Sequence, residues 1–404
     1  SSKIVFTEEN NGHSNLLKKY KISKIEYSIY NDKIKFDKYD WIIDAIFGIG
    51  LSRQLDDKYI SLIKKINGKN NIIAIDVPSG ITDSENDSTV IISKHTVTFG
   101  YSKLSHYMNP LNNYLISDIG FLKLKNSHIN KIEENDVKKI LNPTLRKKNI
   151  HKKQHQCNIM AGNIFYPGAA YLTSMAAIKT GSGYVTLYTY PENNLIPLLQ
   201  SMIPEIIVRD IKYYNSNDNE FPVLVGPGGV TPDFSQIEDS DDLVIDASAI
   251  SCFDDPAYSV EDNISEIPEH SIMTPHIGEF KIFFKINKNK KINLKDLEMI
   301  QKSIDNRIII LKSFNTFIIT EDIIYIMDKG PSLLATAGTG DVLSGILVSL
   351  LSQGYSRLEA SILGTYLHAE AANYYMNYIS KDGMTASDLI NCIPNAFNAL
   401  RKND

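Results

Sequence analysis

One glycine-rich turn near the C-terminus combines two groups whose chemistry seems opposed. The stretch LATAGTGDVLSG, residues 334–345, leads into an apolar segment. Gly338 and Gly340 let backbone N–H groups approach a ligand closely, and the unpaired N–H groups at a helix start suit a phosphate. Asp341, an anion, lies in the same turn. Asp341 either caps or stabilises the N-terminus of the helix, where acidic residues are common, or lies in a cleft as a functional group.

Two further residues could act at the same place. His276 in TPHIGE and Lys312 in LKSFNT each follow a strand-like run. Lys312 can neutralise a phosphate as a point charge, or it can be a solvated lysine at the end of a strand. A lone histidine such as His276 is more often a hydrogen-bonded structural residue than a catalyst. His368 lies in the middle of an expected helix, where we prefer a packing or supporting role.

The elements that must position these residues alternate between strand-like and helix-like patterns. Short β-branched apolar runs separated by helices predict an α/β fold with largely parallel sheets. In such sheets ligands bind beyond the carboxyl ends of the strands, where GPGG (226–229), TPHIGE and LKSFNT are expected. Strand-like runs are 3–6, 24–30, 40–47, 71–77, 96–100, 157–162, 184–190, 222–229, 243–248, 271–276, 307–313 and 316–320, and helical patterns are 14–20, 59–66, 134–141, 168–181, 294–306, 341–354, 359–375 and 387–397.

Length and composition limit the number of domains and the classes of partner that the chain can have. A chain of 404 residues favours two domains, and 43% apolar with 22% charged residues is typical of a globular protein. We place a first domain at 1–125, a charged linker at 126–150 and a second domain at 151–404. A net charge of −5 gives no reason to expect nucleic acid, and no apolar run is long enough for a membrane span. Three scattered cysteines suit a cytoplasmic protein without a cysteine-bound metal, although the chain begins without Met, so a lost targeting segment stays open.

The second domain resembles a known enzyme family, the ADP- or ATP-dependent NAD(P)H-hydrate dehydratases, which have a ribokinase-like fold. The resemblance covers about residues 140–402 in motif order. The pair TPHIGE and ATAGTGDVLSG is its most specific part. The motifs are HK (151–152), AGN-x4-GAA (161–170), TGSGYVT (180–186), GPGG (226–229), TPHIGEF (274–280), LK-x3-T (311–316), LATAGTGDVLSGIL (334–347) and YLHAEAA (366–372).

The resemblance implies repair of a hydrated nicotinamide cofactor. A nucleotide, ADP or ATP with Mg²⁺, would phosphorylate the C6 hydroxyl of NAD(P)H hydrate, and loss of phosphate would restore the double bond. Asp341 would be the base that takes the hydroxyl proton. Gly338 to Gly340 would hold the transferring phosphoryl group. By the same resemblance, the hydrate would contact Ala169, Gly228, His276 and Asp341, and the nucleotide would contact Lys312, Ser313, Phe314, Asn315, Thr316 and Gly340.

Several positions depart from the family pattern without removing Asp341, His276 or Lys312. They affect the fine geometry of the site and leave the reaction class unchanged. Lys153, Gln156 and Ser313 stand where the family usually has glycine, Ser248 replaces an aspartate, and Ala337 stands where glycine is frequent.

The first domain resembles the NAD(P)H-hydrate epimerase that is often fused ahead of this dehydratase. DAIFGIG (44–50), IDVPSG (75–80), TVTFG (96–100), Lys103 and DIG (118–120) carry the resemblance. It implies K⁺ near Asp44 and Ser79 and hydrate contact from Asp76. From the residues alone, two aspartates at strand ends can equally cap turns. No stretch matches the family's GNNGGDG phosphate loop, so we expect a partial domain without epimerase activity.

Two other functions stay open at this stage. One is a small-molecule kinase of the ribokinase superfamily, which would share the GTGD turn. The other is a nucleotide-binding protein without catalysis. We expect small-molecule ligands, a homo-oligomer, and neither nucleic-acid nor membrane partners. The preferred nucleotide, ADP, is a guess from the fused arrangement of the two domains.

Overall fold

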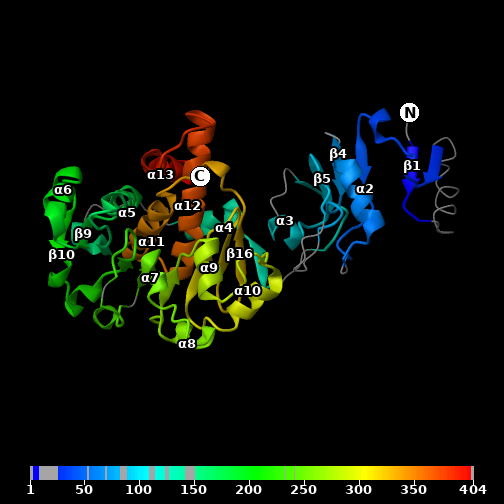
Figure 1. Ribbon diagram of the computed structural model, residues 1–404. Coiled ribbons are helices and arrows are strands. Elements are labelled where there is room, and N and C mark those ends of the chain that lie inside the picture. The colour runs from blue at the N-terminus through cyan, green and yellow to red at the C-terminus, as the bar shows by residue number, and fades with distance from the viewer. Residues whose placement is uncertain are drawn as a thin grey trace. The chain divides into compact units, whose positions relative to one another are not determined.

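The protein consists of two α/β units, as the alternating pattern predicts. The computed structural model describes residues 3–8, 26–51, 54–68, 71–81, 89–108, 114–122, 127–141, 151–231, 233–240 and 242–401. Unit 1 comprises residues 1–123 with 291–294, and unit 2 comprises 124–290 with 295–404 (Figure 1). The helix expected at 14–20 lies outside the described residues.

Unit 1 contains two parallel sheets. The pair β1 (Lys3–Phe6) and β2 (Glu26–Ile29) stands apart from a four-stranded sheet in the order β3-β4-β5-β6. All neighbours in the larger sheet are parallel, so the carboxyl ends of its strands lie at one edge. The remaining elements are β3 (Ile42–Asp44), β4 (Ile72–Ile75), β5 (His95–Phe99), β6 (Tyr114–Ser117), the 3-10 turn η1 (Phe36–Lys38), α2 (Asp57–Asn67) and α3 (Leu104–Met108).

Helix α2 provides the core of unit 1. Asp56 caps it by accepting a hydrogen bond from the Tyr59 N–H. Tyr59, Leu62, Ile63 and Ile66 repeat at helical spacing and are all buried. Lysines in the last turn compensate the helix dipole.

Unit 2 is built on a ten-stranded sheet in the order β10-β9-β8-β11-β12-β13-β14-β15-β16-β7. Only β15 runs against its neighbours. The order reverses between β8 and β11, because the chain moves outward from β8 to β9 and then returns to β11. The strands are β7 (Ile129–Lys131), β8 (Gln156–Met160), β9 (Tyr184–Thr189), β10 (Ile207–Asp210), β11 (Val223–Val225), β12 (Leu243–Ile245), β13 (Ser271–Met273), β14 (Ile308–Leu311), β15 (Thr316–Ile319) and β16 (Ile324–Met327).

Helices α5, α11 and α12 pack against successive strands of this sheet, and α13 packs onto them (Figure 1). The helices are α4 (Glu134–Ile140), α5 (Pro167–Thr180), α6 (Leu195–Met202), α7 (Ser248–Ser251), α8 (Val260–Ser265), α9 (Ile277–Phe283), α10 (Leu294–Gln301), α11 (Thr339–Ser352), α12 (Arg357–Tyr378) and α13 (Ala386–Arg401). The 3-10 turns are η2 (Lys152–His155), η3 (Glu192–Asn194), η4 (Ile211–Tyr213), η5 (Ser216–Glu220), η6 (Phe234–Gln236) and η7 (Ser332–Leu334).

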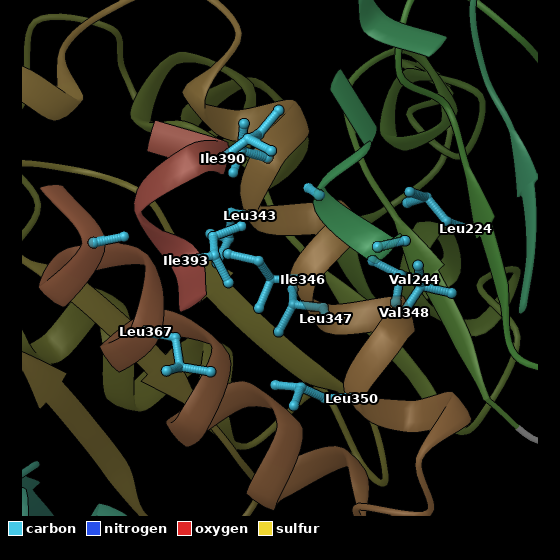
Figure 2. Close-up of a cluster of buried hydrophobic side chains, with 14 of the residues drawn as sticks. Leu224, Val244, Leu343, Ile346, Leu347, Val348, Leu350, Leu367, Ile390 and Ile393 are labelled. Atoms are coloured by element: carbon cyan, nitrogen blue, oxygen red, sulfur yellow. The ribbon is translucent and has the colours of Figure 1, made fainter. Parts of the chain in front are cut away.

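Helix α11 lies at the centre of the unit 2 core. Every residue from Val342 to Ser352 is buried, which agrees with its apolar character on all sides. Figure 2 shows Leu343 facing Ile390 and Ile393 of α13, while Val348 lies beside Val244 of the sheet. A helix enclosed in this way has its position fixed by packing, and so its first turn is fixed as well.

The segment expected to be a linker, 126–150, contains part of unit 2. Strand β7 pairs in parallel with β16 through Ile129 to Lys131, and its ladder extends the large sheet. Helix α4 follows and packs on α12 and α13, burying Val137. The short helix expected at 134–141 is confirmed. The sequence of this segment suggests a linker because β7 has only three residues and α4 carries lysines in its last turn. Residues 142–150 lie outside the described residues.

Sequence reasoning missed several elements, and they share a cause. Strands β6, β7, β10 and β16 have three or four residues, and α7, α8 and α9 are of seven residues or fewer, so none fills a periodicity window. Among the described residues, no helix has the length and apolarity that crossing a membrane requires.

The contact between α5 and α11 depends on a glycine and gives a testable prediction. A Cβ on Gly345 would lie 2.3 Å from the Thr173 carbonyl oxygen, whereas a Cβ on Gly168, also in a helix, meets nothing within 4 Å. We expect Gly345→Ala to lower the free energy of unfolding by about 1–3 kcal/mol through overpacking. Gly168→Ala gains up to about 1 kcal/mol of helix propensity. Urea unfolding followed by far-ultraviolet circular dichroism measures both, and equal midpoints would contradict the packing argument.

Candidate functional site

Five adjacent strands of unit 2 end at the same edge of the sheet. β8, β11, β12, β13 and β14 are mutually parallel, and the expected site residues follow them. This edge includes the reversal of strand order between β8 and β11, where open α/β sheets bind ligands. The first turn of α11 reaches the same edge, since a Cβ on Gly340 would lie 3.3 Å from Lys312 Nζ.

Asp341 does not cap α11. Gly338 is the N-cap, with a positive φ of 87°, and it has no side chain to accept a hydrogen bond from the first N–H groups of the helix. The Asp341 carboxylate accepts no hydrogen bond from any described residue. The N–H groups of Gly340 and Asp341 also have no acceptor within the described chain, and Val342 is the next to bond, to the Gly338 carbonyl. The turn therefore presents two unpaired N–H groups beside an unpaired carboxylate.

The surroundings of Asp341 make its carboxylate a stronger base. Burial and, to a smaller extent, the negative charge of Asp246 raise the pKa of Asp341 to about 6, although the Lys312 ammonium opposes them. A pKa near 6 leaves the group ionised at neutral pH and suited to accept a proton. His368 of α12 supports the same turn, because its Nε2 bonds the Thr339 carbonyl at 2.8 Å. Burial lowers the pKa of His368 to about 4, so it is neutral there.

Lys312 is an anchored residue at the end of β14. Its backbone N–H donates to the Pro275 carbonyl at 2.9 Å, which forms an isolated bridge with His276. Its Nζ lies 2.9 Å from the Asp246 carboxylate, and the side chain is only 22% exposed. The geometry disagrees with the simple alternative of a solvated lysine, since a solvated side chain would not be held between Asp246 and Gly340.

His276 has a clear structural task. It is the N-cap of α9, and its Nδ1 accepts hydrogen bonds from the N–H groups of Gly278 and Glu279. The Glu279 carboxylate accepts in return from the His276 N–H at 2.8 Å, completing a capping box. The side chain is 60% exposed, and its Nε2 lies 3.3 Å from the Glu279 carboxylate. Contact between His276 and the hydrate therefore stays a prediction. The capping bonds to α9 fix the orientation of the ring.

Ala169 and Gly228 lie together at the strand-order reversal. A Cβ on Gly228 would lie 2.9 Å from both the Ala169 Cβ and the Gly162 Cα, so only glycine fits. The Gly162 N–H donates to the Pro227 carbonyl at 2.8 Å and holds the two turns against each other. The result is a close-packed floor made by the starts of two loops and the first turn of α5.

The expected nucleotide segment is the connection of the β14–β15 hairpin. Lys312 ends one strand and Thr316 begins the next. The Ser313 hydroxyl donates to the Asn315 carbonyl at 2.5 Å and fixes the turn. Phe314 is 49% exposed. Of this segment, Lys312 is the residue placed beside Gly340. The nucleotide role of all five residues stays a prediction.

Sequence reasoning gave Asp246 no role, although it singled out Ser248, two residues later, as a departure from the family pattern. Asp246 follows β12, is buried, and pairs with Lys312. Ala247 after it has a φ of 48°, which is unusual for a residue with a side chain. An acidic residue at the end of a fully apolar strand was the available signal. The departure at Ser248 is accommodated, because its hydroxyl donates to the Gly226 carbonyl at 2.7 Å.

In unit 1, Asp44 and Ser79 form a buried pair. The Asp44 carboxylate accepts from the Ser79 N–H at 2.8 Å, from the Ser79 hydroxyl at 2.6 Å and from the Ile46 N–H at 3.2 Å. Burial raises the pKa of Asp44. The structure thus brings together the two residues expected to hold K⁺.

Asp76 lies in a second cluster of unit 1. Its φ is 67°, and its carboxylate is 3.0 Å from Lys103 Nζ and from the Thr98 hydroxyl. Burial raises the pKa of Asp76, but Lys103 and Thr98 outweigh burial and hold it below its usual value. The strained backbone of Asp76 and its ion pair with Lys103 favour a functional role for this residue over simple turn capping. A Cβ on Gly48 would lie 3.6 Å from the Asp76 carboxylate, so the loop at Gly48 borders this cluster.

Comparison with known proteins agrees with both halves of this description. A family model described as NAD(P)H-hydrate dehydratase matches residues 157–395, and one described as YjeF-related protein N-terminus matches residues 1–105. The bifunctional NAD(P)H-hydrate repair enzyme Nnr of Dictyoglomus turgidum is 30% identical over 92% of this chain and 78% of its own length. The Escherichia coli enzyme of the same description is 27% identical over 89% and 72%.

Solved structures support the fold of unit 2. The ADP/ATP-dependent NAD(P)H-hydrate dehydratase of Bacillus subtilis, co-crystallised with ATP and Mg²⁺, covers 68% of this chain and all of its own, with a TM-score of 0.57 and 22% identity. A ribokinase-like protein of Enterococcus faecalis gives 0.58 at 22% identity, over 69% of this chain and 99% of its own. The expected ribokinase-like fold is confirmed, and the chain belongs to the family of bifunctional NAD(P)H-hydrate repair enzymes.

Proposed function

We propose that unit 2 dehydrates (6S)-NAD(P)H hydrate at the cost of a nucleotide phosphate bond, with Asp341 as the base. The observation that carries this proposal is the half-buried Asp341 carboxylate, unpaired among the described residues, beside two unpaired N–H groups and the Lys312 ammonium. Family membership supplies the substrate, since the relatives are named for repair of NAD(P)H hydrate.

The reaction begins with proton transfer to Asp341. Its carboxylate takes the proton of the C6 hydroxyl while that oxygen attacks the terminal phosphoryl group of the nucleotide. The N–H groups of Gly340 and Asp341, with Lys312, stabilise the negative charge that develops on the phosphoryl oxygens. The C6–O bond then breaks to release phosphate, and loss of the neighbouring ring proton restores the double bond of NAD(P)H.

The hydrate and the nucleotide would approach this turn from its two sides. The floor formed by Ala169 and Gly228 would face the hydrate, with His276 at its rim. The hairpin connection from Lys312 to Thr316 would face the nucleotide. Mg²⁺ enters as part of the nucleotide substrate, because this ion is usually held by substrate phosphates and few protein ligands. An activity assay with each nucleotide in turn distinguishes ADP from ATP.

The direct test follows absorbance at 340 nm. The chain is mixed with (6S)-NADH hydrate, Mg²⁺ and either ADP or ATP, and regained absorbance reports NADH. We expect recovery with at least one nucleotide, together with release of inorganic phosphate. A stable phosphorylated product without NADH would instead indicate a small-molecule kinase, and no reaction with either nucleotide would refute the proposal.

Asp341→Asn separates catalysis from a structural role. We expect kcat to fall by about 10²- to 10⁴-fold, the usual contribution of a general base, with nucleotide affinity retained. The folded state holds ionised Asp341 at a cost, because its pKa of about 6 exceeds the unfolded value of 3.8. Removing that charge should stabilise the chain at pH 8 by on the order of 1–3 kcal/mol. Loss of both activity and stability would point to a helix-start role.

The pH dependence of turnover gives an independent check. Protonation of Asp341 removes the base, so kcat/KM should fall as pH decreases through about 6. Stability should change in the opposite direction, because a carboxyl group with a raised folded pKa binds its proton more tightly in the folded state. Initial rates and melting temperatures between about pH 3.5 and 8 measure both. A rate limb near pH 4 would show an unperturbed carboxylate.

Unit 1 is proposed to bind K⁺ without epimerising the hydrate in this 404-residue chain. The Asp44 carboxylate and Ser79 hydroxyl are hard oxygen donors that fit an alkali cation, and a cation would offset the buried charge. We expect K⁺, compared with N-methylglucamine at equal ionic strength, to raise the melting temperature of wild type. Asp44→Asn should abolish the response. Measurable epimerisation of the (6R)-hydrate would contradict the second part.

A further inference from the structure

Asp246 is held by two hydrogen bonds to its carboxylate. Its Oδ1 accepts from Lys312 Nζ at 2.9 Å and from the Ala247 N–H at 2.9 Å. The residue is almost fully buried. A buried carboxylate is costly unless it is paired, so this group is retained together with its partner. The described residues give it one cationic partner, Lys312.

The backbone around Asp246 is arranged to place that carboxylate. Gly226 has a φ of 112°, and a Cβ there would lie 1.8 Å from the Asp246 carbonyl oxygen. Ala247 adopts a φ of 48°, a conformation that costs energy for a residue with a side chain. The strain at Ala247, and a contact at Gly226 that leaves no room for a side chain, indicate that the backbone position of Asp246 is closely specified. An aspartate that only capped a turn would need neither.

The charges facing Asp341 come from three elements. Asp246 follows β12, Lys312 follows β14, and His368 lies on α12. His368 is neutral and bonded to Thr339, so it adds no charge at neutral pH. Within the described residues, no cation lies within ion-pair distance of the Asp341 carboxylate, because Lys312 pairs with Asp246 instead. Lys312 is near enough to lower the pKa of Asp341, so that without Asp246 the proposed base is an anion with which Lys312 can pair.

We propose that Asp246 is a positioning residue, whose carboxylate holds the Lys312 ammonium beside Gly340 and away from Asp341, so that the base stays unpaired. The inference rests on the proposed function of the site. It assigns the two aspartates different tasks: Asp341 accepts the proton, and Asp246 fixes the cation that meets the phosphoryl group. The negative charge of Asp246 also raises the pKa of Asp341, which strengthens the base.

Asp246→Asn tests the proposal. The amide keeps an oxygen for the Ala247 N–H but loses the charge that holds Lys312. We expect KM for the nucleotide to rise about tenfold, as for loss of a charge-assisted hydrogen bond. We expect kcat to fall as Lys312 pairs with Asp341. The acid limb of the rate profile should move down by about one pH unit, because a repelling anion becomes neutral.

Asp210→Asn is the matched control. Asp210 also ends a strand, is buried, and pairs with a lysine, Lys212, at 3.0 Å, but it lies on the edge strand β10. Its variant should keep the rate, the nucleotide KM and the limb near pH 6. If Asp246→Asn behaves in the same way, Asp246 has no positioning role.

Asp246→Glu keeps the inference testable if the asparagine variant folds poorly. The longer carboxylate retains the charge, so the acid limb should stay near pH 6 and nucleotide affinity should partly recover. A lowered rate with an unmoved limb in the asparagine variant, and no recovery with glutamate, would show a purely structural role. Wild-type activity in the same assay separates this failure from that of the proposed function, which would leave wild type inactive.

Discussion

The enclosure of α11 is the constraint on which the proposed site depends. A helix that is buried on every side cannot shift or rotate without opening the core. Its first turn is therefore held at the carboxyl edge of the sheet, with two N–H groups unpaired and Asp341 beside them. The energy that fixes this arrangement comes from Leu343, Ile346, Val348 and their neighbours, and not from the polar groups that would do the chemistry.

The fixed position of this turn also bears on how it could bind a phosphate while carrying the negatively charged Asp341. In water, an aspartate next to a phosphate site would weaken phosphate binding by repulsion. Here the two functions are separated in space, since the backbone N–H groups point one way along the helix axis while the carboxylate is a side chain. Asp246 and Lys312 complete the balance, because an ion pair behind the turn supplies a cation without neutralising Asp341.

Part of this arrangement could be predicted from the sequence, and which part depends on the kind of interaction that each residue makes. Strand-end positions of His276 and Lys312 follow from apolar runs that stop at polar residues, and parallel pairing then places them at one edge. The choice between base and cap for Asp341 could not be made from sequence, because it depends on whether Gly338 or the aspartate is the N-cap of the helix. The capping bonds of His276 were equally hidden, since they need the register of α9. Asp246 escaped notice because its partner is 66 residues away.

The close contact between α5 and α11 has a consequence for the scale of the site. Ala169 stands on one of these helices and Gly340 on the other, and Gly345 lets the two backbones approach until a single methyl group would not fit. The distance between the floor and the turn proposed to bind the phosphoryl group is thus set by packing in the hydrophobic interior. Loops around the edge can vary in length and sequence without changing this spacing. A single methylene added in the interior can change it while leaving every residue of the site in place.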